Sequence, residues 1–235
     1  MRGESRGGSG GERSWLEQAS AAALVIQPFT ILYGVLLAWT PPTAQQLHAS
    51  DPLVQLFAAL AGLWSIPVAA TAVLLVWWLI RPPSRAALAR AGWLGAAAVL
   101  VVVLVMPAGR VLVGPTLPAF IPPEESAKPG MLLGLAAGLI EEVIFRLVVL
   151  PVGLSVGARF TSRRGAAWGA VLGTALLFAL SHEVGPGAAA FSPVYFLDRF
   201  LFPGVLMSAA FFWPGAPFIC TLHCAVHVLL PLLFA

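Results

Sequence analysis

The sequence predicts an all-α fold, a polytopic bundle of about seven transmembrane helices, and three observations support this. Hydrophobic residues make up 59% of the 235 residues and charged residues only 10%, a composition far too apolar for a soluble domain. Several apolar segments approach twenty residues, the length that crosses a hydrocarbon core as a helix. No segment alternates apolar and polar residues as a membrane-spanning strand does, which argues against an outer-membrane barrel.

The expected elements follow in order along the chain. Residues 1–20 are rich in Gly, Ser and Arg and are expected to form a flexible cytoplasmic tail. Residues 21–130 are expected to hold three N-terminal transmembrane helices, and residues 131–235 four more that carry the functional groups. The predicted spans are Ala21–Trp39, Leu56–Ile80, Leu88–Met106, Met131–Leu150, Ala166–Ser181, Phe200–Phe212 and Ala216–Phe234.

Proline and glycine predict where the spans bend or end. Pro67 lies inside the second predicted span, and Pro203–Gly204 interrupts the sixth. Because proline removes a backbone hydrogen bond, each is expected to kink its helix. Trp213–Gly215, a Trp-Pro-Gly sequence, predicts a tight turn into the last span.

The distribution of Lys and Arg predicts the orientation of the chain. The N-terminal segment and the two loops on its side of the membrane hold nine: Arg2, Arg6, Arg13, Arg81, Arg85, Arg90, Arg159, Arg163 and Arg164. The opposite loops hold three: Arg110, Lys128 and Arg199. Cytoplasmic loops carry the excess of positive charge, so the N-terminus is expected in the cytoplasm.

The fourth predicted span is unusual because ionisable residues lie near its middle. At that depth each costs roughly 2.5–3.5 kcal/mol, so a partner, a water-filled cavity or chemistry is expected there. Glu142 and Arg146 are four residues apart on one helix face and are expected to pair. Glu141 is turned by about 100° and shares its face with Gly134 and Gly138, which allow another helix to approach closely.

Three histidines are the other ionisable groups of interest in the predicted spans. His182 ends the fifth span, where Gly169 and Gly173 predict a second close-packing surface. His223 and His227 lie four apart on one face of the seventh span. Because lipid cannot satisfy such groups, the helices are expected to turn them toward the glutamates.

This set of residues predicts peptide hydrolysis by an activated water molecule. A buried Glu141 with His182 beside it can take a proton from water and direct the oxygen at a carbonyl carbon. His223 and His227 can donate hydrogen bonds to the developing oxyanion. No covalent intermediate and no cofactor is needed for this chemistry.

Two alternatives stay open on the residues alone. Two helix histidines four apart can bind zinc, with Glu141 and His182 completing the site, but Cys224 occupies the place of the glutamate in HExxH. The chain could instead be a non-catalytic immunity or chaperone-like membrane protein whose polar groups brace helix packing. Cys220 and Cys224 are expected to be small packing residues.

The order and spacing of these motifs resemble the CPBP family, the CAAX protease and bacteriocin-processing (Abi) intramembrane proteases. This family includes the type II CAAX prenyl endopeptidases. The resemblance covers about residues 130–230 and lies in three motifs: Glu141-Glu142-xxx-Arg146, Phe178-xxx-His182, and His223 with a polar residue four positions on.

The resemblance implies an intramembrane glutamate-dependent endopeptidase with no metal. It implies that Glu141 activates water with His182, that Glu142 and Arg146 organise the site, and that His223 and residue 227 form the oxyanion hole. The family usually has Asn at the last of these positions, where this chain has His227. A neutral imidazole can still donate one hydrogen bond, although its protonation would make that role pH-dependent.

The resemblance also implies a substrate and a location. The expected substrate is a protein with a membrane-embedded or lipidated C-terminal segment, cleaved within the lipid of the bacterial cytoplasmic membrane. The short chain also resembles the myxosortases, which trim C-terminal sorting tails, and the place of His182 at the outer end of its span suits an exported substrate. The net charge of +3, scattered over loops, argues against a nucleic-acid partner.

Overall fold

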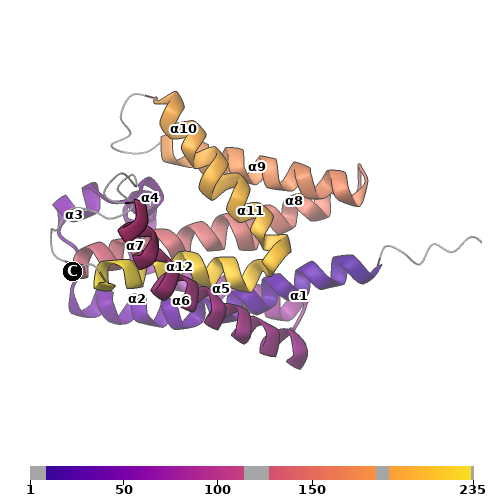
Figure 1. The fold of residues 1–235 in the computed structure, drawn as a ribbon, viewed down its shortest axis with the longest axis horizontal. Coiled ribbons are helices and arrows are strands. Elements are labelled where there is room, and N and C mark those ends of the chain that lie inside the picture. The colour runs from indigo at the N-terminus through magenta and orange to yellow at the C-terminus, as the bar shows by residue number, and fades with distance from the viewer. Residues whose placement is uncertain (1–8, 114–126, 184–190, 234–235) are drawn as a thin grey trace, which may run out of the picture.

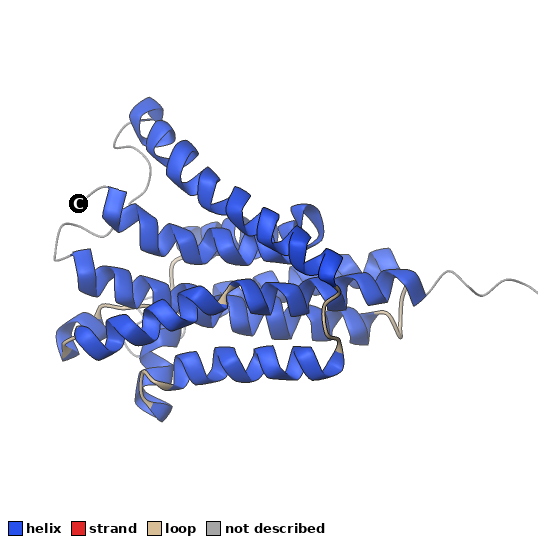
Figure 2. Ribbon diagram, turned by 90° about the horizontal axis from the view of Figure 1, so that it is seen from below, coloured by secondary structure: helices blue, strands red, loops and turns tan. Residues whose placement is uncertain are grey.

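The fold is a bundle of helices, as predicted. The computed structural model describes residues 9–113, 127–183 and 191–233, and within these ranges every regular element is a helix (Figure 2). The elements are α1 (Ser9–Val25), α2 (Gln27–Trp39), α3 (Ala44–His48), α4 (Pro52–Ala61), α5 (Ser65–Ile80), α6 (Arg85–Val113), α7 (Ala127–Glu141), the π-helical η2 (Glu142–Val149), α8 (Leu150–Gly157), α9 (Arg163–Glu183), α10 (Pro193–Arg199), the π-helical η3 (Phe200–Leu206), α11 (Met207–Ala210), η4 (Phe211–Gly215) and α12 (Ala216–Leu233). In Figure 1, α12 runs through the middle of the bundle, where it packs against α6, α7 and α1.

The first helix begins earlier than the sequence predicts. Residues 1–20 are expected to be a flexible tail, but α1 starts at Ser9 and includes the second half of that segment. The reason is packing, because Ala19 and Ser20 are fully buried and α1 lies against α5, α6 and α12. Residues 1–8 lie outside the described residues.

Among the described residues, four helices are long and apolar enough to cross a membrane: Trp15–Trp39, Arg85–Leu104, Arg163–Glu183 and Pro193–Leu229. The number of candidate spans among the described residues becomes five if α4 and α5, which are bent by 94° relative to each other, count together as one span. The last of the four joins the two final predicted spans, and the helix of the fourth predicted span is not among them because it carries three ionisable residues. The fold class is therefore as predicted, and the exact number of seven spans stays a prediction.

The chain bends at the predicted turns, with one shift in position. The break between α4 and α5 falls at Gly62, whose φ of 75° ends α4, and not at Pro67, which lies in the first turn of α5. A proline is tolerated in a first turn, and a glycine accepts a positive φ, so this placement avoids a kinked helix interior. The turn predicted at Trp213–Gly215 is confirmed, with Trp213 in extended conformation (φ −156°, ψ 118°).

The predicted close-packing surface on α9 is wrong. A Cβ added at Gly169 or Gly173 would meet no atom within 4 Å, and both residues instead line a groove of about 280 Å³ between α8 and α9. Close approach to α9 occurs instead at glycines of other elements. An added Cβ would lie 2.9 Å from the Ala175 Cβ at Gly204 in η3, and 3.2 Å from the Ala166 Cα at Gly157 in α8. The break at Pro203–Gly204 thus serves to bring η3 onto α9.

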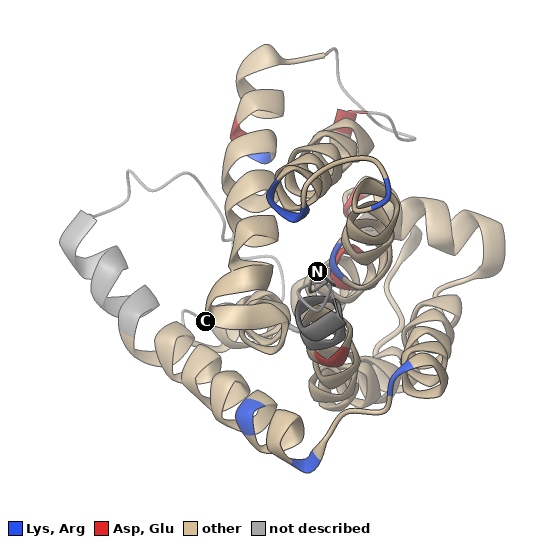
Figure 3. Ribbon diagram, turned by 90° about the vertical axis from the view of Figure 1, so that its right-hand side faces the viewer, with Lys and Arg blue, Asp and Glu red and all other residues tan. Residues whose placement is uncertain are grey.

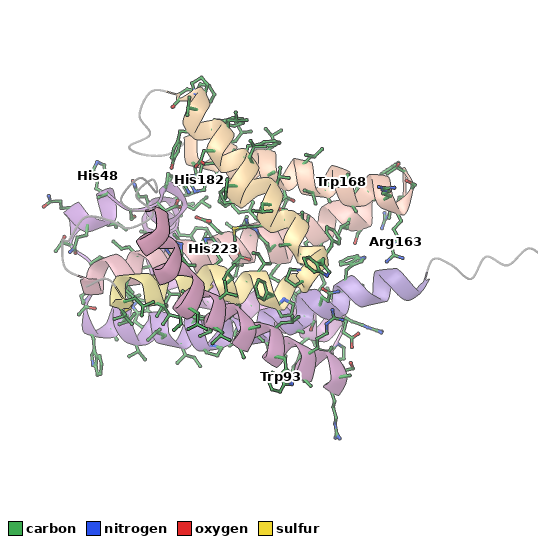
Figure 4. The ribbon with its side chains drawn as sticks, in the orientation of Figure 1. His48, Trp93, Arg163, Trp168, His182 and His223 are labelled. Atoms are coloured by element: carbon green, nitrogen blue, oxygen red, sulfur yellow. The ribbon has the colours of Figure 1, made fainter. Side chains whose placement is uncertain are left out.

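The two ends of the bundle differ in character. The start of α1 and the turn between α8 and α9 lie at one end, the right in Figure 1, where Figure 4 labels Arg163. Figure 3 looks onto this end and shows blue Lys and Arg segments at the connections between helices. His182 lies toward the other end, beside the start of α4, where its Nε2 is 3.1 Å from the Asp51 Oδ2.

Candidate active site

Glu141 lies between two imidazoles that come from two other helices. It is the last residue of α7, is buried, and faces α9 and α12. Its Oε1 is 3.5 Å from the His182 Nε2 and its Oε2 is 3.6 Å from the His223 Nε2. The structure therefore brings together the carboxylate and two of the three histidines that the sequence singles out. Figure 4 labels these two histidines, His182 and His223.

Glu142 and Arg146 form the expected pair, and each of the two side chains also contacts a residue of another element. The Arg146 Nη1 lies 3.3 Å from the Glu142 Oε1, and both side chains are fully buried. The same oxygen accepts a hydrogen bond of 2.7 Å from the His223 Nδ1. The Arg146 Nη2 donates to the Pro203 carbonyl at 2.6 Å, so the guanidinium links η2 to η3, while Glu142 links η2 to α12. This geometry fixes which nitrogen of His223 faces Glu141.

His182 is oriented by its own helix. Its Nδ1 lies 2.8 Å from the Phe178 carbonyl oxygen, one turn earlier in α9, and its ring packs on the Phe178 ring at a centroid distance of 4.6 Å. The Phe178 ring also contacts Arg146, whose Cζ is 5.0 Å from the ring centroid. The shared helix face of Phe178 and His182 thus aims the Nε2 at the carboxylates.

The His227 ring occupies the space next to Gly134 and Gly138 of α7, where the glycines have no side chains. Its Nε2 is 3.4 Å from the His223 Nε2. A Cβ added at Gly134 would lie 2.9 Å from the His227 Nδ1, and one at Gly138 would lie 3.1 Å from its Cδ2. Close approach of α7 and α12 is therefore obtained as predicted, and its result is to seat this ring beside His223.

Asp51 joins the site from the N-terminal half of the chain, and sequence reasoning missed it. Its Oδ2 lies 3.1 Å from the His182 Nε2, closer than Glu141 does. Its Oδ1 accepts a hydrogen bond of 2.8 Å from the Leu53 backbone N–H, which caps the start of α4. A signal existed, because Asp51 is the only acidic residue between Glu17 and Glu124, and Asp-Pro is a typical helix start.

A metal ion could be held by a different set of residues from the one that the sequence predicts. Among the described residues, one ligand atom each of Asp51, Glu141 and His182 lie within 4.8 Å of one another. Two carboxylates and one imidazole are ligands that divalent transition metals accept. The predicted zinc set included the His223–His227 pair, which is not part of this group. Cys220 and Cys224 are free and buried, as expected of packing residues.

A comparison with protein families gave one match, in the C-terminal part of the chain. Residues 124–229 match the family model described as type II CAAX prenyl endopeptidase Rce1-like. We call these residues the Rce1-like segment, and they make up less than half of the chain. Comparisons with curated proteins and with solved structures gave no match. The Rce1-like match implies a peptidase and, together with the apolar helices, an integral membrane protein.

The Rce1-like segment contains all six residues that the sequence analysis assigns to the site, and Asp51 lies outside it. The resemblance stated from the motifs is therefore confirmed at the level of the family. The individual roles of the residues, and the narrower likeness to the myxosortases, stay predictions.

Proposed function

We propose that this protein is a glutamate-dependent intramembrane endopeptidase that needs no metal. The observation that carries the proposal is the Glu141 carboxylate, buried in the Rce1-like segment with a different imidazole against each of its oxygens. Glu142 is neutralised by Arg146, whereas Glu141 has no Lys or Arg partner among the ion pairs of the described residues. An acid held in this way is suited to take a proton from water.

The proposed reaction uses one water molecule and forms no covalent intermediate. Glu141 takes a proton as the water oxygen attacks the peptide carbonyl carbon, and the carbonyl electrons move to its oxygen. His227 donates a hydrogen bond to that oxyanion, and the Nε2 of His223 donates a second one. For this the His223 Nε2 must carry a proton in addition to the Nδ1–H that is donated to Glu142. Preorganised donors of this kind are worth most in a water-poor site. The C–N bond then breaks, and the amine nitrogen takes a proton from His182, which regains it from Glu141.

Glu142 and Arg146 are positioning residues in this proposal. Glu142 accepts a hydrogen bond from the Nδ1 of His223 and so orients the imidazole ring. The Nε2 of the same ring is thereby directed at Glu141. Arg146 balances the charge of Glu142 and fixes η3 through the Pro203 carbonyl. Without these contacts a fully buried carboxylate would have no counter-charge, which is strongly destabilising.

The proposed substrate is a protein with a membrane-embedded or lipidated C-terminal segment, in the bacterial cytoplasmic membrane. His182 and Asp51 lie at the end of the bundle opposite the basic α8–α9 turn, which the positive-inside rule places in the cytoplasm. The site then opens toward the outer face, where an exported protein presents its tail. This placement supports processing of a C-terminal sorting tail, as in the myxosortases.

Replacement of Glu141 tests the proposal. We expect Glu141→Gln to abolish cleavage of an internally quenched peptide that ends in a prenylated Cys-aliphatic-aliphatic-Met sequence, because the amide cannot accept the proton of water. Full-length protein in detergent is used, with Glu17→Gln as the matched control, since Glu17 only accepts a hydrogen bond from the Ser84 N–H. Unchanged cleavage by Glu141→Gln would contradict the proposal.

Chelation separates the metal-free reaction from the zinc alternative that Asp51, Glu141 and His182 allow. We expect wild-type cleavage to be insensitive to EDTA and 1,10-phenanthroline, because the proposed water is activated by the carboxylate alone. Loss of cleavage on chelation, with recovery on adding Zn²⁺, would show that the metal alternative is right.

A further inference from the structure

The groove between α8 and α9 opens to the outside of the bundle, and no other element of the described chain fills it (Figure 1). Its volume is about 280 Å³, and its walls are built mainly of glycine and alanine. We propose that this α8–α9 groove binds the membrane helix of the substrate and thereby brings the bond to be cleaved to the active site. The inference rests on the proposed function and names the part of the substrate that the enzyme recognises.

The glycines on the two walls of the groove differ in what they contact. On α8, a Cβ added at Gly157 would lie 3.2 Å from the Ala166 Cα, so this glycine serves the contact between α8 and α9. On α9, Gly169 and Gly173 are exposed, and a Cβ added at either would meet no atom within 4 Å. Two glycines four apart in a membrane helix let a second backbone approach closely. This face of α9 therefore has the form of a helix–helix contact whose partner lies outside the described chain.

Thr174 adds a polar group to the groove. It is one of the lining residues, it is only 1% exposed, and its Oγ1 has no hydrogen-bond partner among the described residues. Three other threonines donate the hydroxyl to the carbonyl four residues earlier in the chain, namely Thr30, Thr40 and Thr71. Threonine hydroxyls in membrane proteins also bond groups of a neighbouring helix. The Thr174 hydroxyl is thus left for a carbonyl or hydroxyl of a helix that enters the groove.

The course of α9 connects the groove to the active site. Thr161 and Gly165 line the groove at the basic turn, and Leu177 lines it farther along α9. His182 follows Leu177 on the same helix after a rise of about 7.5 Å. A helix that lies along the groove therefore has one end at the basic turn and the other beside the active site.

An exported substrate with a C-terminal membrane helix fits this geometry. In the orientation that the positive-inside rule predicts, α9 runs from the cytoplasmic face to the outer face. The helix of such a substrate runs the opposite way, so its N-terminal end lies at the level of His182. The bond just before the helix is then the one that reaches Glu141.

The groove fits two other occupants less well. A lipid chain would leave the buried Thr174 hydroxyl without a hydrogen bond, which is costly. A second copy of this protein has the same orientation in the membrane, so a pair joined at α9 would bring two basic turns together. Each turn carries Arg159, Arg163 and Arg164, and like charges repel.

A synthetic helix tests whether the groove binds a membrane helix. The probe is a fluorescent peptide of roughly twenty Leu and Ala residues with two glycines four apart, added to full-length protein in phosphatidylcholine nanodiscs. We expect Gly173→Leu to raise its Kd about tenfold or more, because the leucine fills the groove without meeting the rest of the chain. Gly92→Leu on α6 is the matched control, since a Cβ added at Gly92 also meets no atom within 4 Å. Its Kd should equal that of wild type.

Cleavage tests whether the bound helix belongs to the substrate. The quenched cleavage sequence is attached to the N-terminal end of the probe helix and compared with the same sequence alone. We expect Gly173→Leu to raise the KM of the helix-bearing peptide about tenfold and to leave the KM of the helix-free peptide within about twofold. Thr174→Val, which removes the hydroxyl and keeps the shape, should raise the first KM about threefold.

Several results would overturn the inference. They are an equal Kd in Gly173→Leu and wild type, an equal loss of binding in Gly92→Leu, and a helix-bearing peptide that wild type cleaves no better than the helix-free one. Conversion of a dimer to a monomer by Gly173→Leu would overturn it in favour of a second copy, and loss of a copurified phospholipid from this variant in favour of a lipid. If the probe binds as expected while Glu141→Gln still cleaves the helix-free peptide, the proposed function fails and the helix-binding surface stands.

Discussion

At the residue scale, the site depends on which ring atoms face each other. His223 donates its Nδ1–H to Glu142, so only its Nε2 is directed toward Glu141 and His227. His227 is seated by glycines, because any side chain at Gly134 would collide with its ring. His227, which departs from the family pattern, is therefore held in place by its neighbours, as are the residues that match the pattern.

His227 should be replaceable by the family's usual residue. We expect His227→Asn to retain cleavage within about tenfold, because the Asn amide donates a hydrogen bond from a similar position. His227→Ala should lower kcat by roughly 10²–10³, the cost of losing one oxyanion donor. Steady-state kinetics on the prenylated peptide measure both values. Equal activity of His227→Ala and wild type would exclude the proposed role.

At the element scale, two π-helical segments shape the site. Side chains from other elements bond carbonyls in both segments: the Trp77 Nε1 donates to the Leu147 carbonyl in η2 at 2.8 Å, and Arg146 donates to the Pro203 carbonyl in η3 at 2.6 Å. Each segment is thereby fixed to its neighbours. Backbone groups inside a membrane need such partners, because they have no water to bond. Arg146 is the link between the two segments, and its loss should affect the whole site.

Removal of the Arg146 charge should destabilise the fold as well as stop cleavage. We expect Arg146→Met to lower stability by roughly 3–5 kcal/mol, because Glu142 is left buried without its counter-charge. The double variant Glu142→Gln with Arg146→Met should be less unstable than Arg146→Met alone, since no buried charge is then unpaired. Thermal unfolding in detergent measures both. A single variant as stable as wild type would contradict this account of the pair.

Much of the element scale could be predicted from the sequence, and the reasons are physical. Apolar length predicts membrane helices, and ionisable residues inside them must meet, so the approach of Glu141, His182 and His223 was foreseeable. The early start of α1 and the open groove at Gly169 were not, because they depend on which neighbour a helix meets. Asp51 was missed because it lies between two predicted spans, Ala21–Trp39 and Leu56–Ile80, where an ionisable residue needs no buried partner.

At the scale of the whole molecule, the N-terminal half completes the site that the Rce1-like segment begins. The α4 segment packs against α7 and α9, which carry Glu141 and His182. That contact places Asp51 beside His182, and His182 lies toward the end of the bundle opposite the basic α8–α9 turn (Figure 4). The orientation of the chain in the membrane therefore decides which compartment the site faces.

Cysteine labelling tests this orientation. Both native cysteines are buried, so a single cysteine introduced at an exposed position reports on its own side. We expect Ala49→Cys, next to the Asp51 loop, to react with a membrane-impermeant maleimide on intact cells. Ser162→Cys, in the basic turn, should react only after permeabilisation, because the positive-inside rule predicts that this turn lies in the cytoplasm. The reverse pattern would show that the site opens to the cytoplasm.

The central claim is that Glu141 activates water and does not itself attack the substrate. A single turnover of excess enzyme in H₂¹⁸O tests this most directly, with mass spectrometry of the product and of the proteolysed enzyme. The account predicts one ¹⁸O atom in the new C-terminal carboxylate of the product and none in the peptide that contains Glu141. An unlabelled product together with ¹⁸O in Glu141 would contradict it.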